Sequence, residues 1–383
     1  MLERPAAGER AVIVQLDFGQ LDVEDQVEEV RLLTESAGGL VVAEVRGRRQ
    51  SPDPKTFAGK GKVEEIAAMI ASADAQLVIF NHPLSPVQQR NLEHELKCRV
   101  VDRNTLILDI FALRAASAEG KLQVELAQLE HLSTRLVRGW THLERQRGGI
   151  GMRGPGETQL ETDRRLLGKR VKLLKDRLQK LARQRSVQRK ARRRGEILNV
   201  SLVGYTNAGK SSLFNALVKA RAYAADQLFA TLDTTTRQMF LGDVGRSVSL
   251  SDTVGFIRDL PHTLVDAFAA TLQEARDADL LLHVVDASNP SHLEQIGHVM
   301  TVLTEIGAHD IPQILVFNKL DALPEDRRPA QRSDSMELDG LEVARIFLSA
   351  HTGEGLNELR SMLAARLIET LPGERPFSEN VPV

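Results

Sequence analysis

The sequence predicts an α/β protein in which two α/β domains flank a long helical segment. Short apolar runs alternate with amphipathic stretches over residues 1–120 and again over residues 195–371. Residues 121–194 instead carry a repeat of mostly apolar side chains at alternating spacings of four and three. Strands that alternate with helices need crossover connections, so both sheets are expected to be mostly parallel.

The first 120 residues are expected to form a small α/β domain. Its best-defined helix covers 85–97, because Ser85 is a capping residue and Pro86 fits the first turn. The other apolar runs and periodicities predict strands over 11–16, 40–47, 76–80 and 98–102, and helices over 22–38, 61–74 and 103–117.

Residues 121–194 are expected to form an antiparallel coiled-coil helical hairpin with a glycine-rich loop at 148–157. Side chains spaced four and three apart form the narrow seam along which two helices pack. The first seam comprises Leu122, Leu126, Leu129, Ser133, Leu136, Trp140 and Leu143. The second comprises Leu167, Val171, Leu174, Leu178 and Leu181.

Charge is distributed unevenly along the chain, although the net charge is only −2. Residues 1–120 carry 14 basic and 19 acidic side chains, residues 121–194 carry 21 and 7, and residues 195–383 carry 15 and 26. Within the basic middle segment, residues 164–194 hold fifteen Lys and Arg against one acidic residue, Asp176. This density favours binding to a nucleic-acid backbone, with a solvated helix face as the alternative.

The composition excludes several other classes of protein. Cys98 is the single cysteine, so an intrachain disulfide and a cysteine-based metal site are excluded. The N-terminus lacks the features of a signal peptide, and no apolar run approaches the ~18 residues that a membrane span needs. We therefore expect a cytoplasmic protein without a membrane span.

A phosphate-binding loop is predicted at residues 199–212, where an apolar strand, a glycine-rich turn and an amphipathic helix follow one another. Gly204, Gly209, Lys210 and Ser211 occupy the fixed places of the pattern G-x-x-x-x-G-K-[ST]. Backbone N–H groups would wrap the phosphates, Lys210 would reach the β and γ phosphates, and the Ser211 hydroxyl would ligate Mg²⁺. The other residues of the predicted loop are Tyr205, Thr206, Asn207, Ala208 and Ser212.

Three short motifs that follow predicted strands favour GTP over ATP. A strand-end carboxylate at Asp252 would orient the water shell of Mg²⁺, and the N–H of Gly255 would approach the γ-phosphate. The Asp321 carboxylate would accept the N1–H and 2-amino group of guanine, which adenine lacks. The motifs are Asp252, Thr253, Val254 and Gly255; Asn318, Lys319, Leu320 and Asp321; and Ser349, Ala350 and His351. All of them lie where a doubly wound sheet binds its ligand.

With FATLD at 229–233, this motif order resembles the translation-factor-related branch of P-loop GTPases. GKGKVEEI (59–66), RNTLILDIFALRA (103–115) and GGIGMRGPGETQLETDRR (148–165) extend the resemblance to the HflX family over nearly the whole chain. FATLD is similar to the first switch of that branch, which implies that Thr231 ligates Mg²⁺ when GTP is bound. The switch residues are Phe229, Ala230, Thr231, Leu232 and Asp233.

The resemblance implies a GTPase that binds the large ribosomal subunit and splits stalled or idle ribosomes, with a role in stress recovery. Lys210, Thr231 and Gly255 are the expected catalytic residues. Arg147, next to the glycine-rich loop, and Arg153 within it are expected to contact ribosomal RNA. The alternative is an assembly or binding factor in which hydrolysis only triggers release. The protein is expected to be a monomer.

Hydrolysis is expected to be slow, because Phe256 occupies the position where many GTPases carry a glutamine that orients water. The ribosome is the expected activator, and a K⁺ ion supported by Asn207 is a second hypothesis. GKGK at 59–62 leaves open a second, ATP-binding site or, more simply, a basic surface. Residues 372–383 read as a C-terminal tail, in place of the further domain that many family members carry.

Overall fold

The computed structural model describes residues 8–19, 22–139, 155–193, 197–218, 228–258, 269–338 and 340–370. They form two compact units. The N-terminal unit comprises Met1–Ala182, Asp226–Leu232 and Asp259–Phe268, and the C-terminal unit comprises Arg183–Ala225, Asp233–Arg258 and Ala269–Val383. No helix within the described ranges is long and apolar enough to cross a membrane.

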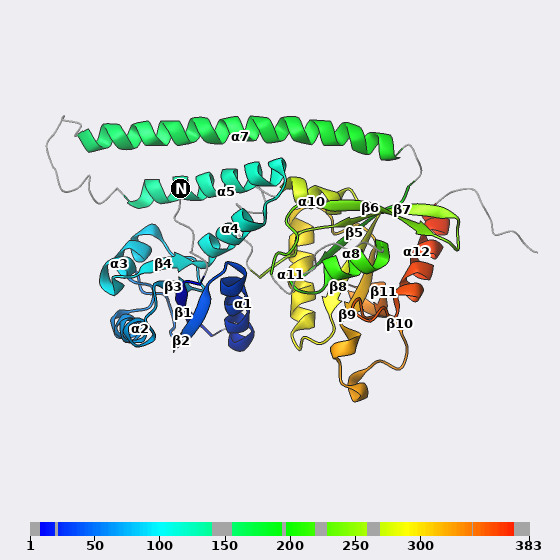
Figure 1. The fold of residues 1–383 in the computed structure, drawn as a ribbon, viewed down its shortest axis with the longest axis horizontal. Coiled ribbons are helices and arrows are strands. Elements are labelled where there is room, and N and C mark those ends of the chain that lie inside the picture. Colours follow the sequence, from blue (N-terminus) through cyan, green and yellow to red (C-terminus); the bar gives the residue numbers. More distant parts are fainter. Residues whose placement is uncertain are drawn as a thin grey trace, which may run out of the picture. The chain divides into compact units, whose positions relative to one another are not determined.

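A four-stranded, wholly parallel sheet with the order β2-β1-β3-β4 forms the centre of the N-terminal unit. Its strands are β1 (Arg10–Asp17), β2 (Leu40–Arg48), β3 (Leu77–Phe80) and β4 (Arg99–Asp102). The helices between and after them are α1 (Val23–Ser36), α2 (Lys60–Ala73), α3 (Pro86–Leu96) and α4 (Arg103–Arg114) (Figure 1). The expected small α/β domain is confirmed, and Ser85 and Gln88 form a reciprocal capping box at the start of α3.

Helix α5 (Ala118–Gly139) has a second apolar face that the sequence analysis missed. Val124 and Ala127 are buried, and α5 packs on both α3 and α4. The predicted seam described only the other side of the helix, where Leu126 is buried and Leu122 half-buried. Val124 and Ala127 lie outside the seven-residue repeat, so the repeat marked only one of the two faces of α5.

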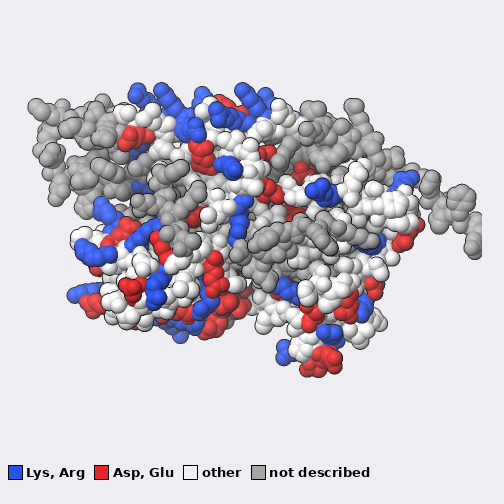
Figure 2. All heavy atoms as spheres, in the orientation of Figure 1, with Lys and Arg blue, Asp and Glu red and all other residues white. Residues whose placement is uncertain are grey.

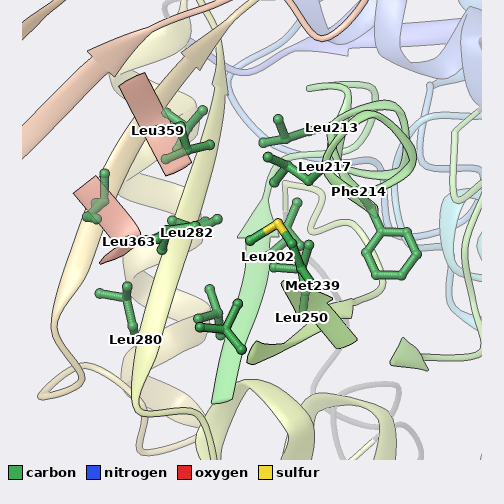
Figure 3. Close-up of a cluster of buried hydrophobic side chains, with 14 of the residues drawn as sticks. Leu202, Leu213, Phe214, Leu217, Met239, Leu250, Leu280, Leu282, Leu359 and Leu363 are labelled. Atoms are coloured by element: carbon green, nitrogen blue, oxygen red, sulfur yellow. The ribbon is translucent and has the colours of Figure 1, made fainter. Parts of the chain in front are cut away.

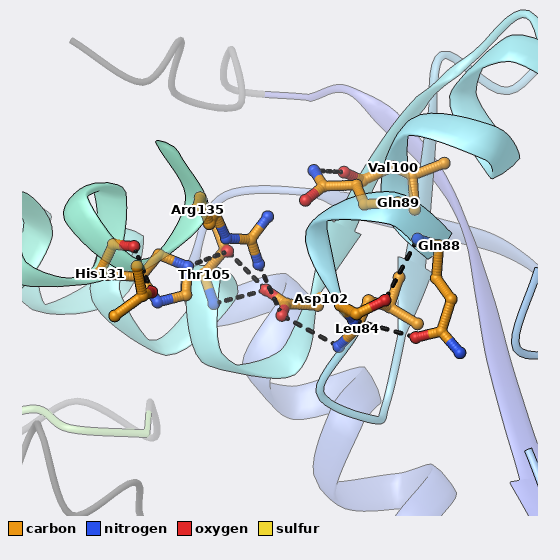
Figure 4. Close-up of polar contacts among 10 residues, drawn as sticks. Leu84, Gln88, Gln89, Val100, Asp102, Thr105, His131 and Arg135 are labelled. Atoms are coloured by element: carbon orange, nitrogen blue, oxygen red, sulfur yellow. Dashed lines mark hydrogen bonds and ion pairs between the residues drawn. The ribbon is translucent and has the colours of Figure 1, made fainter. Parts of the chain in front are cut away.

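A buried carboxylate, Asp102, fastens α5 to the end of the sheet (Figure 4). Asp102 caps α4 by accepting from the backbone N–H of Thr105 at 2.9 Å, and it also accepts from the Leu84 N–H at 3.2 Å. The guanidinium of Arg135 on α5 donates to the same carboxylate at 2.8 Å. His131, one turn earlier, lies 3.2 Å from the Thr105 hydroxyl, and burial lowers its pKa.

Helix α7 (Pro155–Arg193) lies beside α5, and its residues 155–182 belong to the N-terminal unit (Figure 1). Arg170 pairs with Glu125 at 2.6 Å, and Lys175 pairs with Glu130 at 2.7 Å. The predicted seam residues of α7 are buried or half-buried, whereas the described side chains between them are exposed. The loop at 148–154 lies outside the described residues, so the coiled-coil hairpin itself stays a prediction.

The C-terminal unit is built on a seven-stranded sheet with the order β10-β11-β9-β8-β5-β7-β6. The central strands are parallel, and the two edge strands, β6 and β10, are antiparallel to their neighbours. The strands are β5 (Asn199–Gly204), β6 (Thr235–Leu241), β7 (Arg246–Asp252), β8 (Leu280–Asp286), β9 (Gln313–Asn318), β10 (Ser333–Leu338) and β11 (Leu341–Phe347). The helices are α8 (Lys210–Val218), α10 (Ala269–Arg276), α11 (His292–Glu305) and α12 (Leu356–Thr370), with the short 3₁₀ turns η1 (Leu320–Ala322) and η2 (Glu325–Arg327).

Buried leucines join the centre of this sheet to α8 and α12 (Figure 3). Leu202 of β5 and Leu282 of β8 are fully buried, as are Leu213 on α8 and Leu359 on α12. Each fully buried aliphatic side chain contributes about 1.5–3 kcal/mol through removal from water. This core fixes the strand ends from which the predicted nucleotide-binding motifs extend.

Replacing Asp102 with Ala is expected to lower the free energy of unfolding of the N-terminal unit by about 3–5 kcal/mol, since Arg135 would be left buried without its carboxylate. Glu24→Ala, which breaks an exposed pair with Arg46, is the control and should cost less than about 1 kcal/mol. Hydrogen exchange of the α4 and α5 amides measures both changes. Equal protection in the two variants would contradict the anchoring role of Asp102.

Candidate functional site

The loop between β5 and α8 needs glycine at both of its fixed positions. Gly204 has a φ of +146°, and a Cβ on it would lie 2.2 Å from the carbonyl oxygen of Val284. Gly209 has a φ of +89°, and a Cβ there would lie 2.2 Å from the Asn318 amide nitrogen. Any larger residue would clash and would also adopt an unfavourable backbone conformation. The local geometry is that of a loop wrapped around a small anionic group.

The ammonium group of Lys210 lies inside this loop. It donates to the carbonyl oxygens of Gly204 at 3.0 Å and Tyr205 at 2.7 Å, and the residue is 6 % exposed. Burial lowers the Lys210 pKa to about 8, and the nearby Asp252 partly opposes this shift. A phosphate in the loop would supply the negative charge that favours the protonated form.

The side-chain oxygens of Ser211 and Asp252 meet next to the loop. The Ser211 hydroxyl donates to Asp252 Oδ2 at 2.7 Å, and Asp252 stands at the end of β7, 3 % exposed. Hydroxyl and carboxylate oxygens fit Mg²⁺, a hard cation that takes its remaining ligands from phosphates and water. No cluster of three His, Cys, Asp or Glu that could hold a metal exists in the described ranges.

The motif after β7 lies directly against the loop. A Cβ on Gly255 would lie 2.9 Å from both the Lys210 ammonium and the Thr206 methyl group. Phe256, which follows it, is fully buried. Its carbonyl accepts from the Thr206 N–H at 2.7 Å, and its own N–H donates to the Gly204 carbonyl at 3.1 Å. The Phe256 side chain is thus a buried apolar group in this segment.

The motifs after β9 and β11 meet beside the same loop. The Asn318 side chain donates to the Ala208 carbonyl at 2.9 Å and accepts from the Ala350 N–H at 2.9 Å. Asp321 accepts from the Ser349 hydroxyl at 2.5 Å, and His351 lies 3.7 Å from its other oxygen. Asn318 therefore ties the phosphate loop to the segment that carries the Asp321 carboxylate.

Sequence reasoning missed Asp286, at the end of β8. Its carboxylate pairs with the Lys319 ammonium at 2.7 Å, and Lys319 has a φ of +65°. This contact orients a long side chain beside the expected base-binding segment. An aspartate directly after the apolar run of β8 was the available signal, but no pattern linked it to a partner 33 positions later.

The predicted switch residues Phe229 and Thr231 fall within the N-terminal unit as the chain divides. Leu228 and Phe229 belong to the N-terminal unit. The Phe229 ring is 4.6 Å from that of Phe111 on α4, and the Leu228 N–H donates to the Ser36 hydroxyl at 3.0 Å. The expected Mg²⁺ contact of Thr231 therefore stays a prediction.

The predicted RNA-contacting residues Arg147 and Arg153 lie outside the described residues. The basic surface beyond them is described: Figure 2 shows Lys and Arg side chains gathered along α7. Arg170 and Lys175 are paired with α5. The other exposed basic side chains described on the N-terminal-unit part of α7 are Arg164, Arg165, Lys169, Lys172, Arg177 and Lys180.

Comparison with known proteins gives matches along most of the chain. Family models described as "GTP-binding GTPase N-terminal", "GTP-binding GTPase Middle Region" and "50S ribosome-binding GTPase" match residues 24–112, 114–192 and 199–319. The GTPase HflX of Escherichia coli is 56% identical over 368 residues, which cover 96% of this chain and 85% of that protein. The GTPase HflX of Magnetococcus marinus is 47% identical over 370 residues, covering 95% and 83%.

A solved structure shares the fold. The crystal structure of SsGBP in complex with GDP matches with a TM-score of 0.52 and 24% identity, covering 94% of this chain and 99% of that one.

Exchanging Asp321 for Asn is expected to change which base the site binds. An amide cannot accept both guanine N–H groups, so the affinity for GTP should fall at least about 100-fold. Xanthosine triphosphate, which carries a carbonyl in place of the 2-amino group, should bind the variant better than GTP. Calorimetric titration measures both nucleotides, and Asp326→Asn on the exposed η2 turn is the control. Unchanged GTP affinity in Asp321→Asn would refute the assignment.

A buried histidine near Lys210 makes the stability of the C-terminal unit depend on pH. His283 of β8 is 1% exposed and lies 3.3 Å from the Gln313 side-chain oxygen. Burial is the main cause that lowers the His283 pKa to about 4, and Lys210 adds repulsion. The folded protein therefore holds this imidazole neutral, whereas the unfolded chain protonates it below about pH 6.5.

The His283 contribution to stability is expected to be complete above about pH 6.5 and to fall by about 3 kcal/mol as the pH drops towards 4. His283→Gln should flatten this part of the pH profile, because glutamine does not titrate. His309→Gln, at a half-exposed surface site, should leave the profile unchanged. Denaturant unfolding of the wild type and the two variants between pH 4 and 7.5 gives the free energy of unfolding as a function of pH. If this dependence is the same in all three proteins, His283 is not the titrating group.

Proposed function

Because the chain belongs to the HflX family of GTPases, we propose that it binds the large ribosomal subunit and separates stalled or idle ribosomes. The family and the GTPase model over residues 199–319 show that it binds and hydrolyses GTP. The ribosomal part rests on the description of that model as a "50S ribosome-binding GTPase" and on the basic surface of α7. We further propose a monomer that acts in the cytoplasm during stress.

The α7 surface is the observation that supports RNA as the ligand. Two of its basic residues are neutralised by α5, whereas Arg164, Arg165, Lys169 and Lys172 are exposed on the same stretch of helix. Like charges three and four residues apart destabilise a helix. A phosphate backbone would relieve this repulsion and release its own condensed counterions. Arg147 and Arg153, which precede α7 in the sequence, are proposed as further RNA contacts.

The nucleotide site supports a slow hydrolase. Lys210 and the Gly255 N–H would neutralise charge that develops on the γ-phosphate. Ser211 and Thr231 would hold Mg²⁺, which supplies further charge neutralisation when bound. Phe256 has no group that can orient water, so the remaining stabilisation would come from the ribosome or from K⁺ beside Asn207. Asn207 has a φ of +61°, within the turn of the loop.

Sedimentation of intact ribosomes with the full chain and GTP, a nonhydrolysable GTP analogue or GDP tests the proposal. Splitting with GTP or its analogue, and none with GDP, is the expected result. If the chain binds the subunit but splits nothing with any nucleotide, ribosome splitting is refuted, and a binding or assembly factor that hydrolysis releases remains.

The α7 surface has its own test. A variant with four exposed basic residues of α7 changed to Gln should bind the large subunit more weakly: Arg164, Arg165, Lys169 and Lys172. The logarithm of the binding constant should also fall less steeply with the logarithm of the salt concentration. This slope should decrease by about one unit for each phosphate that the variant no longer neutralises. The matched control changes four exposed basic residues elsewhere to Gln: Arg90, Lys97, Arg327 and Arg328. Equal affinity and equal slope in the two variants would rule out α7 as the RNA-binding surface.

A further inference from the structure

The chain that follows β7 is fastened to the phosphate loop by its backbone. Tyr205 and Phe256 form an isolated parallel β-bridge. Its two hydrogen bonds join Thr206 N–H to the Phe256 carbonyl at 2.7 Å and Phe256 N–H to the Gly204 carbonyl at 3.1 Å. Any sequence could make these bonds, since they involve only main-chain atoms. They hold the segment after β7 to the phosphate loop at Phe256.

A side chain provides the second point. The Tyr205 hydroxyl accepts from the backbone N–H of Arg258 at 2.9 Å, and Tyr205 is 7 % exposed. The Arg258 guanidinium in turn lies 3.3 Å from Glu294 on α11. The segment is therefore held at Phe256 by main-chain bonds and at Arg258 by the tyrosine hydroxyl.

Gly255 lies immediately before these two anchors. The Lys210 ammonium and Thr206 approach it so closely that a Cβ would have contacts of 2.9 Å. Of the guanine nucleotides, only the triphosphate carries the γ-phosphate that the Gly255 N–H is expected to meet. Ordering a free backbone residue costs about 1–2 kcal/mol, so a segment ordered beforehand binds that phosphate at lower cost.

We propose that the Tyr205 hydroxyl is a positioning group that sets the preference of the site for GTP over GDP. By holding Arg258, it keeps Gly255 in place for the γ-phosphate before the nucleotide arrives. The inference rests on GTP binding and on the γ-phosphate contact of Gly255, and it is independent of the ribosome. Phenylalanine would keep the buried ring and remove the hydroxyl group, so Tyr205→Phe isolates the contribution of that group.

The test measures the dissociation constants of the full chain for GDP and for a nonhydrolysable GTP analogue. Tyr205→Phe should weaken binding of the analogue about fivefold, the usual effect of removing one hydrogen bond, and leave the GDP constant within about twofold. In steady-state hydrolysis the KM for GTP should rise, while kcat falls less. The ratio of the two dissociation constants is a readout that a general loss of stability would not change.

Ser201→Ala is the matched control. Its hydroxyl lies on the same strand, β5, and donates to the Glu274 carbonyl at 2.8 Å, away from the phosphate loop. This variant should lose a comparable amount of stability and keep the wild-type ratio of the constants.

Two results would overturn the role of Tyr205: equal weakening of GDP and analogue, or no change in either. A wild-type chain that binds neither nucleotide would instead overturn the GTPase assignment itself.

Discussion

The close approach of backbone at the carboxyl end of β5 is the constraint on which the nucleotide site depends. Gly204 passes so near the Val284 carbonyl that no side chain fits between the two strands. This allows the following loop to turn sharply and places Lys210 at the start of α8. Strands β7, β8 and β9 run parallel to one another or to β5, so their functional residues emerge at the same edge. The buried leucines beneath keep these strand ends in register.

Burying the Lys210 ammonium group costs free energy, and a bound phosphate would offset that cost. Lys210 is buried and donates to the carbonyl oxygens of Gly204 and Tyr205, and burial lowers its pKa, which expresses that cost. A buried ammonium close to Gly255 attracts any anion that can enter the loop. Affinity for phosphate thus follows from an arrangement that is unfavourable in the empty protein, a common relation between function and stability.

The sequence was most informative where one residue type is required by geometry. Gly204, Gly209 and the carboxylates after the strands could be placed from their spacing alone, because glycine and strand ends leave local signals. Contacts between distant positions left none: the Lys319–Asp286 pair and the Asp102–Arg135 anchor join polar residues common on any surface. The edge strands β6 and β10 were missed, since few of their side chains are buried. For helix α5 the repeat identified one apolar face and missed the second, which packs on α3 and α4.

Leu228 and Phe229 lie beyond residue 195 in the sequence, yet their contacts are with Ser36 and Phe111 of the N-terminal unit. A fragment that begins at residue 195 would lose the Leu228 backbone hydrogen bond to Ser36 and the contact of the Phe229 ring with Phe111. The predicted first switch, residues 229–233, would then differ in solvation from the same segment in the whole chain. Rates measured on such a fragment would describe a different loop, and truncation is therefore a poor way to assign the share of each unit in hydrolysis.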